Sequence, residues 1–160
     1  MKKIIYIIPG WKESSQYKIY QSLAASAKKK GYDAIFYEID WSRPLSSQIF
    51  PVQKDAIVFG FSLGAILARL IAQKYACRKL ILASMTPPRS FKDKKLKKEL
   101  ADLLGRAFVE DISKKLHIKH RARNQVIIYG DREAESGDSI VPRTGHRLNA
   151  RYIKEIVGLL

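Results

Sequence analysis

Short apolar runs alternate along this chain with stretches of helical spacing, and this alternation limits the folds available to it. The apolar runs are residues 3–9, 34–39, 56–61, 79–85, 125–130 and 139–142. Helical patterns occupy residues 15–31, 63–76, 90–117 and 148–160. Such alternation is typical of parallel strands joined by right-handed crossovers, with helices covering both faces of the sheet. We therefore predict an α/β fold, a three-layer sandwich of about six mostly parallel strands.

The sequence has the size and composition of one domain. It has 160 residues, of which 46% are hydrophobic, and no internal repeat or linker, so we expect a single domain over residues 1–160. The one cysteine, Cys77, cannot form an internal disulfide, which fits a reducing compartment. The chain starts like a secretory signal, but its apolar run ends at Pro9, and no stretch is long enough to span a membrane. We expect a cytoplasmic protein, and no feature indicates an oligomeric state.

The chain is strongly basic. It carries 30 Lys and Arg against 15 Asp and Glu, a net charge of +15. The excess is concentrated at residues 28–30, 91–100 and 114–123. Such a field attracts nucleic acid, anionic membranes or anionic ligands. These runs have few aromatic residues and no nucleic-acid-binding module, so solvated helix faces are the favoured interpretation and nucleic-acid binding is the alternative.

Polar residues and glycines follow four of the predicted strands. In an open parallel sheet, binding sites form at the carboxyl ends of the strands. The first strand is followed by Pro9, Gly10 and Trp11, the third by Ser62 and Leu63, the fifth by Asp131 and Glu133, and the last by Thr144, Gly145 and His146. The sequence therefore places a serine, a carboxylate and a histidine, in that chain order, at one edge of the sheet.

The segment GFSLG, residues 60–64, lies between the third strand and a helix. A serine on a sharp strand-to-helix turn needs small neighbours, because bulky side chains would clash with its strained backbone. Gly60 and Gly64 provide that space. The alternative interpretation is that Ser62 is only a small residue in a tight crossing.

These motifs resemble those of the α/β-hydrolases over nearly the whole chain. GFSLG resembles the nucleophile elbow G-x-S-x-G of that family, in the required strand–turn–helix context. IIPGW, residues 7–11, resembles the family's first strand and oxyanion turn, with proline in place of the usual histidine. YGDRE, residues 129–133, resembles the acid-bearing segment, with glutamate at the acid position. SIVPRTGHRL, residues 139–148, resembles the last strand and its Gly-His turn.

The resemblance implies a role for each of these residues. Ser62 would be the nucleophile and His146 the general base. The backbone N–H groups of Leu63 and Trp11 would stabilise the oxyanion, with Gly10 forming the turn. Gly10 and Trp11 have plain alternatives as turn and core residues. His117 and His120 fall in a Lys/Arg-rich region that we interpret as a surface helix, so His146 is the favoured base.

Three carboxylates are candidates for the residue that orients His146. Position favours Glu133, which fits the family's acid position, over Asp131, which lies nearer the strand. Asp138 ranks third, because it would lie at the start of the last strand, about 15 Å from the site. Glutamate can hold a histidine as aspartate does, although it is longer.

The predicted function is that of a small serine hydrolase acting on a carboxylic ester or thioester through an acyl-enzyme. The chemistry requires no cofactor or metal, and no His/Cys cluster suggests one. The chain omits the family's first two strands and nearly all of the helix between the acid and the last strand, so we expect an open pocket. Residues 87–120 are the one segment available to cover it, as a small basic helical cap. The alternative is a non-catalytic protein that binds RNA or anionic ligands through its basic segment.

Overall fold

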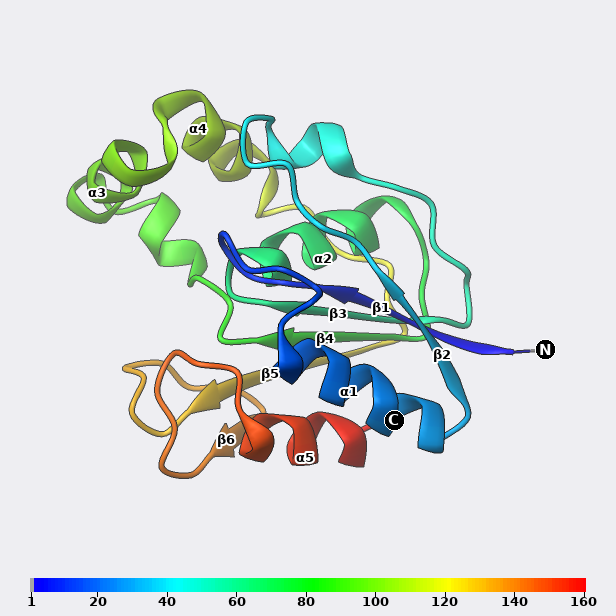
Figure 1. Ribbon diagram of the computed structural model, residues 1–160. Helices are drawn as coiled ribbons and strands as arrows, with labels where there is room; N and C mark the ends of the chain where they lie inside the picture. The colour runs from blue at the N-terminus through cyan, green and yellow to red at the C-terminus, as the bar shows by residue number, and fades with distance from the viewer. Residues whose placement is uncertain (1) are drawn as a thin grey trace.

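A single six-stranded parallel sheet forms the middle layer of the protein, which we describe over residues 2–160 in a computed structural model (Figure 1). The strands are β1 (Lys3–Ile8), β2 (Tyr32–Phe36), β3 (Ile57–Phe61), β4 (Lys79–Ala83), β5 (Asn124–Gly130) and β6 (Ser139–Val141). Their order across the sheet is β2-β1-β3-β4-β5-β6, and every neighbouring pair is parallel. The predicted fold class is therefore confirmed.

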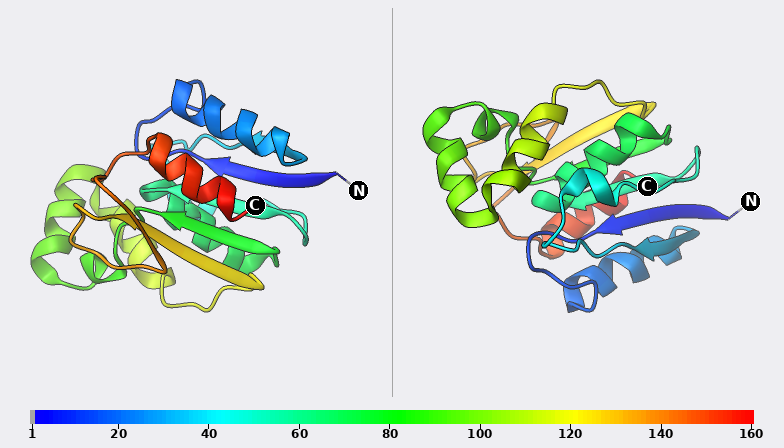
Figure 2. Two further views of the ribbon diagram at one scale, coloured as in Figure 1. Left: turned by 90° about the horizontal axis from the view of Figure 1, so that it is seen from below. Right: turned by 90° about the horizontal axis from the view of Figure 1, so that it is seen from above.

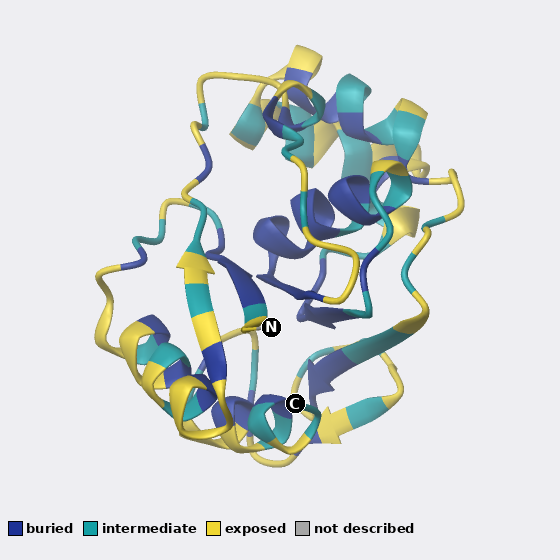
Figure 3. Cartoon of the chain, turned by 90° about the vertical axis from the view of Figure 1, so that its right-hand side faces the viewer, coloured by how far each residue is buried: buried dark blue, intermediate teal, exposed yellow. Residues whose placement is uncertain are grey.

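Helices cover both faces of this sheet. The α-helices are α1 (Lys18–Lys29), α2 (Leu63–Lys74), α3 (Lys94–Leu104), α4 (Arg106–Lys115) and α5 (Ala150–Gly158), and short 3-10 turns lie at Leu45–Gln48 and Pro88–Phe91. Helices α1 and α5 lie side by side on one face, whereas α2 and α4 pack on the other (Figure 2). The central strands and α2 are the most buried parts of the molecule (Figure 3).

The central strands are apolar throughout because each contributes side chains to two cores. In β3, Val58 packs in the core beneath α2, and its neighbours Ile57 and Phe59 pack in the core beneath α1 and α5. In β1, Ile8 packs in the core beneath α2, and Ile7 packs in the core beneath α1 and α5. This alternation follows from the two-residue period of a strand.

The segment between β4 and β5 forms the basic helical pair that the sequence predicts, interrupted at Gly105 with φ 94°. Helices α3 and α4 lie on the α2 side of the sheet, toward the carboxyl ends of the strands (Figure 1). The carboxylate of Asp111 anchors α4 to the turn at Leu45–Gln48, because it accepts hydrogen bonds from the N–H (3.0 Å) and hydroxyl (2.6 Å) of Ser46. Lys115 is ion-paired with the same carboxylate at 2.7 Å.

One detail of the sequence interpretation is wrong. Helix α4 ends at Lys115, so His117 and His120 lie in the connection to β5 and not in a helix. His117 is exposed, and His120 is partly buried beside the end of α2, where burial lowers its pKa. None of the helices within residues 2–160 combines the length and the hydropathy needed to cross a membrane.

Candidate active site

Ser62 lies on a strained turn between β3 and α2. Its backbone has φ 56° and ψ −121°, a region that residues with a side chain rarely adopt. Its N–H donates to the carbonyl of Ala83 at the end of β4, 2.9 Å away, which holds the turn against the neighbouring strand. The serine is 8% exposed, so only its outer surface meets solvent.

The two glycines of the GFSLG segment allow backbones to approach more closely than any side chain permits. A Cβ atom at Gly60 would lie 2.3 Å from the carbonyl oxygen of Gly64. A Cβ atom at Gly64 would lie 2.3 Å from the oxygen of Pro9 and 2.4 Å from that of Ile8. The space requirement predicted for both glycines is therefore confirmed, and the first turn of α2 rests directly on the end of β1.

His146 and Glu133 form a hydrogen-bonded chain with Ser62. The Oγ atom of Ser62 lies 2.8 Å from Nε2 of His146, and Nδ1 of the same ring lies 2.8 Å from Oε1 of Glu133. With the proton on Nδ1, the ring donates to the carboxylate and its Nε2 is free to accept from the serine. The contacts predicted between these three residues are present, while His117 and His120 lie in the connection after α4.

Glu133 is held by four hydrogen-bond partners. Its Oε2 accepts from the N–H of Gly130 (2.7 Å) and the hydroxyls of Ser84 (2.7 Å) and Tyr152 (3.0 Å), and Oε1 faces His146. Burial acts to raise the pKa of this carboxyl, but the hydrogen bonds from these four groups outweigh it and lower the pKa. The carboxylate therefore stays ionised and fixed in orientation.

Sequence reasoning missed Ser84 and Tyr152. Ser84 is buried with φ 46°, and its hydroxyl lies 2.5 Å from that of Tyr152. Burial raises the pKa of the Tyr152 phenol, so it remains a donor. The available signal was the position of Ser84 directly after β4, at the same edge as the other polar residues, whereas Tyr152 matches the apolar face of α5 and is indistinguishable from core by its spacing.

The other two acid candidates bond elsewhere. Asp131 accepts from the N–H groups of Arg143 (2.7 Å) and Thr144 (2.9 Å), and these bonds lower its pKa. It thus tethers the loop that carries His146. Asp138 lies at the start of β6 and accepts from the N–H of Ile127 at 2.8 Å. Neither carboxylate bonds to His146.

The turn after β1 lies against the Ser62 turn. A Cβ atom at Gly10 would lie 3.3 Å from the carbonyl oxygen of Phe61, the residue before Ser62. Leu63 is the first residue of α2, where helical N–H groups have no partner within the helix. Within residues 2–160, the N–H groups of Leu63 and Trp11 donate no hydrogen bond. Neither of the two N–H groups predicted to stabilise an oxyanion is therefore used by another group in the described part of the chain.

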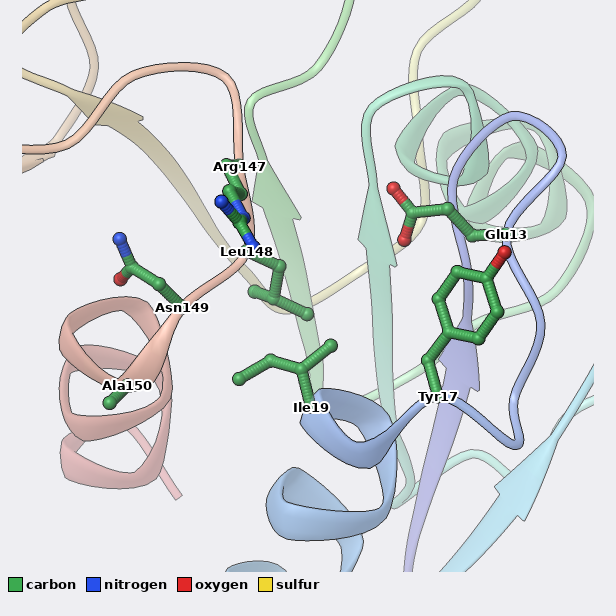
Figure 4. Close-up of a pocket in the computed structure, with 7 residues that line it drawn as sticks. All are labelled: Glu13, Tyr17, Ile19, Arg147, Leu148, Asn149 and Ala150. Atoms are coloured by element: carbon green, nitrogen blue, oxygen red, sulfur yellow. The ribbon is translucent and has the colours of Figure 1, made fainter.

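A cavity of about 530 Å³ is lined in part by the residues that follow His146 in the chain, although Ser62, His146 and Glu133 do not line it (Figure 4). One side comes from the turn after β1 and the start of α1, and the other from the segment that enters α5. Its lining is Glu13, Tyr17, Ile19, Arg147, Leu148, Asn149 and Ala150. The lining combines the apolar side chains of Ile19 and Leu148 with the acidic Glu13 and the basic Arg147. In the described part of the chain, no group of three His, Cys, Asp or Glu side chains is placed to hold a metal ion.

The similarity of this chain to known proteins is found by comparing three-dimensional structures and not by comparing sequences. No protein-family model matches this sequence, and no curated protein matches it. Alpha/beta hydrolase domain-containing protein 10 from mouse superposes with a TM-score of 0.71 at 13% identity, over 98% of this chain and 87% of that one. The chain has the α/β-hydrolase fold. A protein from Agrobacterium vitis S4 (TM-score 0.70, 13% identity, 99% of this chain and 86% of that one) and human thioesterase 2 (0.61, 12%, 99% and 94%) share it.

The segment between Glu133 and the last strand contains no helix, as the sequence predicts, because residues 131–138 form a loop. The loop approaches β5 closely, since a Cβ atom at Gly137 would lie 2.5 Å from the oxygen of Ile127. A Cβ atom at Gly130, the last residue of β5, would lie 2.1 Å from the oxygen of Thr144. The segment that carries His146 is therefore packed directly against the end of β5.

The glycine contacts lead to a stability prediction. We expect Gly64→Ala to lower the free energy of unfolding by about 1–3 kcal/mol or more, because its Cβ would overlap backbone atoms that cannot move freely. Urea denaturation measures the change. Gly158→Ala is the matched control, since nothing lies within 4 Å of its Cβ position and alanine favours a helix. Equal stability of the two variants would contradict the packing argument.

Proposed function

We propose that the protein is a serine hydrolase that cleaves a carboxylic ester or thioester through an acyl-enzyme. The chain of hydrogen bonds from Ser62 through His146 to Glu133 is the observation that supports it most. In this proposal Ser62 is the nucleophile, His146 the general base and Glu133 the group that fixes the imidazole. The shared fold with proteins named as hydrolase and thioesterase adds support at the level of the hydrolase class.

The reaction would run in two steps. In the first, Nε2 of His146 takes the proton of Ser62 while Oγ attacks the carbonyl carbon, and the protonated imidazole then gives that proton to the departing alcohol or thiol. In the second, water attacks the acyl carbon while Nε2 of His146 takes a proton from the water. The imidazolium then returns this proton to Oγ of Ser62 as the bond between Oγ and the acyl carbon breaks, and the carboxylic acid is released. The imidazolium that forms in each step lies against the ionised Glu133, which stabilises it.

The N–H groups of Leu63 and Trp11 would stabilise the charge on the carbonyl oxygen. Leu63 lies at the N-terminus of α2, where the helix dipole also favours negative charge. Both groups are already free of other acceptors within residues 2–160, so they need no rearrangement as charge develops. In this proposal the substrate is a small-molecule ester or acyl compound, and Gly10, which has no side chain, lets the turn after β1 lie close to the Ser62 turn.

We expect Ser62→Ala to abolish hydrolysis of short p-nitrophenyl esters and labelling by a fluorophosphonate probe, because no other group can form the acyl bond. Circular dichroism should show the fold unchanged. Ser22→Ala, an exposed position on α1, is the matched control and should retain both signals. Undiminished turnover in the Ser62 variant would end the proposal.

The acid assignment is tested by three isosteric changes in one esterase assay. Glu133→Gln should lower kcat by about 10²–10⁴-fold, because an amide cannot stabilise the imidazolium and breaks the fixed hydrogen-bond pattern. Asp131→Asn should have a smaller effect through the His146 loop, and Asp138→Asn the smallest. If only Asp138→Asn lost activity, the assignment of Glu133 as the residue that orients His146 would be wrong.

A groove on the basic cap favours a second candidate function, the binding of RNA or another anionic ligand without catalysis. The groove lies between α3 and α4, has a volume of about 440 Å³ and is lined by Lys94, Lys97, Lys98 and Arg106 together with Asp102 and Glu110. Only one lining pair, Lys97 with Glu110, is ion-paired within residues 2–160. The two functions differ in fluorophosphonate labelling, which requires a reactive serine.

The cap lysines should not contribute to hydrolysis. Replacing Lys94, Lys97 and Lys98 by glutamine should leave kcat/KM for a neutral ester within about twofold, because the groove they line contains no residue of the Ser62–His146–Glu133 chain and a neutral ester carries no charge for them to attract. The same variant should show a weaker salt dependence of binding to single-stranded RNA in a fluorescence titration. Loss of esterase activity with the fold intact would contradict the interpretation of this surface as solvated.

A further inference from the structure

A closed set of hydrogen bonds surrounds Gly10. Its N–H donates to the hydroxyl of Tyr20 (3.1 Å), that hydroxyl donates to Oε2 of Glu13 (2.5 Å), and the N–H of Glu13 donates back to the carbonyl of Gly10 (3.1 Å). Gly10 is therefore held at both its donor and its acceptor by only two residues. Neither Tyr20 nor Glu13 takes part in the Ser62–His146–Glu133 chain.

Holding the Gly10 carbonyl also orients the next amide. The peptide unit is planar and trans, so the C=O of Gly10 and the N–H of Trp11 point in opposite directions. The bond from the N–H of Glu13 fixes the direction of that carbonyl. The Trp11 N–H is consequently fixed in direction while it donates to no other group in the described part of the chain.

This turn lies directly against the Ser62 turn. The oxygens of Ile8 and Pro9 contact the position of Gly64, and Gly10 itself lies beside the carbonyl of Phe61. A small rotation of the Gly10 peptide would therefore change the alignment of the Trp11 N–H relative to Ser62. Hydrogen bonds weaken steeply with misalignment, so the orientation of this donor affects how well it can stabilise an oxyanion.

Tyr20 is suited to hold the turn because its ring is packed in the core. The side chain lies on the buried face of α1, with 0% exposure. Burial, together with the adjacent Glu13, raises the pKa of the phenol far above its usual value, so it remains protonated and can donate to the carboxylate. Glu13 is half-buried, and its carboxylate extends from the turn toward the cavity beside Arg147 (Figure 4).

The geometry points to Tyr20 and Glu13 as positioning residues for the oxyanion turn. The Tyr20 hydroxyl, itself held by the Glu13 carboxylate, holds the N–H of Gly10, and the backbone N–H of Glu13 holds the carbonyl of Gly10, so together they set the direction of the Trp11 N–H. The inference rests on the proposed serine hydrolase function. Tyr32 provides the contrast. It is also almost fully buried, at 1% exposure, but its hydroxyl bonds to the carbonyl of Leu160 at the opposite edge of the sheet.

The test compares Tyr20→Phe with Tyr32→Phe, which each remove one hydroxyl from a buried ring. For a neutral p-nitrophenyl ester, we expect Tyr20→Phe to lower kcat by about 10- to 100-fold while KM changes by less than about twofold, because only the transition state uses the donor. Tyr32→Phe should keep the wild-type kcat. If the two hydroxyls act only by stabilising the fold, kcat should instead fall in both variants in proportion to their loss of thermal stability.

Changes at Glu13 test the same unit from its other end. Glu13→Gln keeps an oxygen that accepts from Tyr20 and should retain kcat within about threefold, whereas Glu13→Ala should lower kcat in the same direction as Tyr20→Phe. The Tyr20→Phe/Glu13→Ala double variant should lose little more than Tyr20→Phe alone, because residues that act as one unit are non-additive. If Tyr20→Phe does not fold, the comparison of Glu13→Gln with Glu13→Ala tests the positioning role by itself.

The outcomes separate this inference from the function on which it rests. A wild-type protein that hydrolyses no ester and resists the fluorophosphonate would overturn both. An active wild type whose Tyr20→Phe and Glu13→Ala variants keep the full kcat would overturn only the positioning role. Additive losses in the double variant, or a loss in Tyr32→Phe equal to that in Tyr20→Phe, would also overturn it.

Discussion

The contact between the first turn of α2 and the end of β1 is the constraint on which the site depends. The backbone oxygens of Ile8 and Pro9 lie where a side chain at Gly64 would begin, and Gly60 admits the same helix turn from the other side. This approach holds Ser62 at φ 56° and places its side chain above the sheet edge. Because the turn after β1 is part of the same contact, the strained serine and the free N–H of Trp11 are fixed by one packing arrangement.

Glu133 links the remaining parts of the site. Its carboxylate receives donors from the end of β5, the residue after β4, helix α5 and the His146 loop, so segments far apart in the chain meet at one group. Burying a carboxylate is costly unless it is fully hydrogen-bonded, and four donors meet that requirement. Asp131 adds a separate tether that holds the backbone of the same loop. The imidazole is thus oriented by a network and not by one contact.

The basic helices α3 and α4 contribute no side chain to this network. The contact between Asp111 and Ser46 anchors α4 on the α2 side of the sheet, while the cavity of Figure 4 lies on the side of α1 and α5. Positive charge is not confined to these two helices, because Arg147 follows His146 directly and lines that cavity.

The sequence by itself determined the layer architecture, the glycines around Ser62 and the order of serine, carboxylate and histidine, because these depend on strand periodicity, local sterics and the position of each residue after a strand. The preference for Glu133 over Asp131 came from the resemblance to the hydrolase motif. Only the tertiary structure decided that Ser84 and Tyr152 hold Glu133 and that Tyr20 and Glu13 hold Gly10. Tyr20 and Tyr152 lie at ordinary core positions of their helices, and an apolar spacing pattern does not record where a hydroxyl points. Their partners come from other strands and loops, so the contacts exist only once the two helices have packed side by side on the sheet.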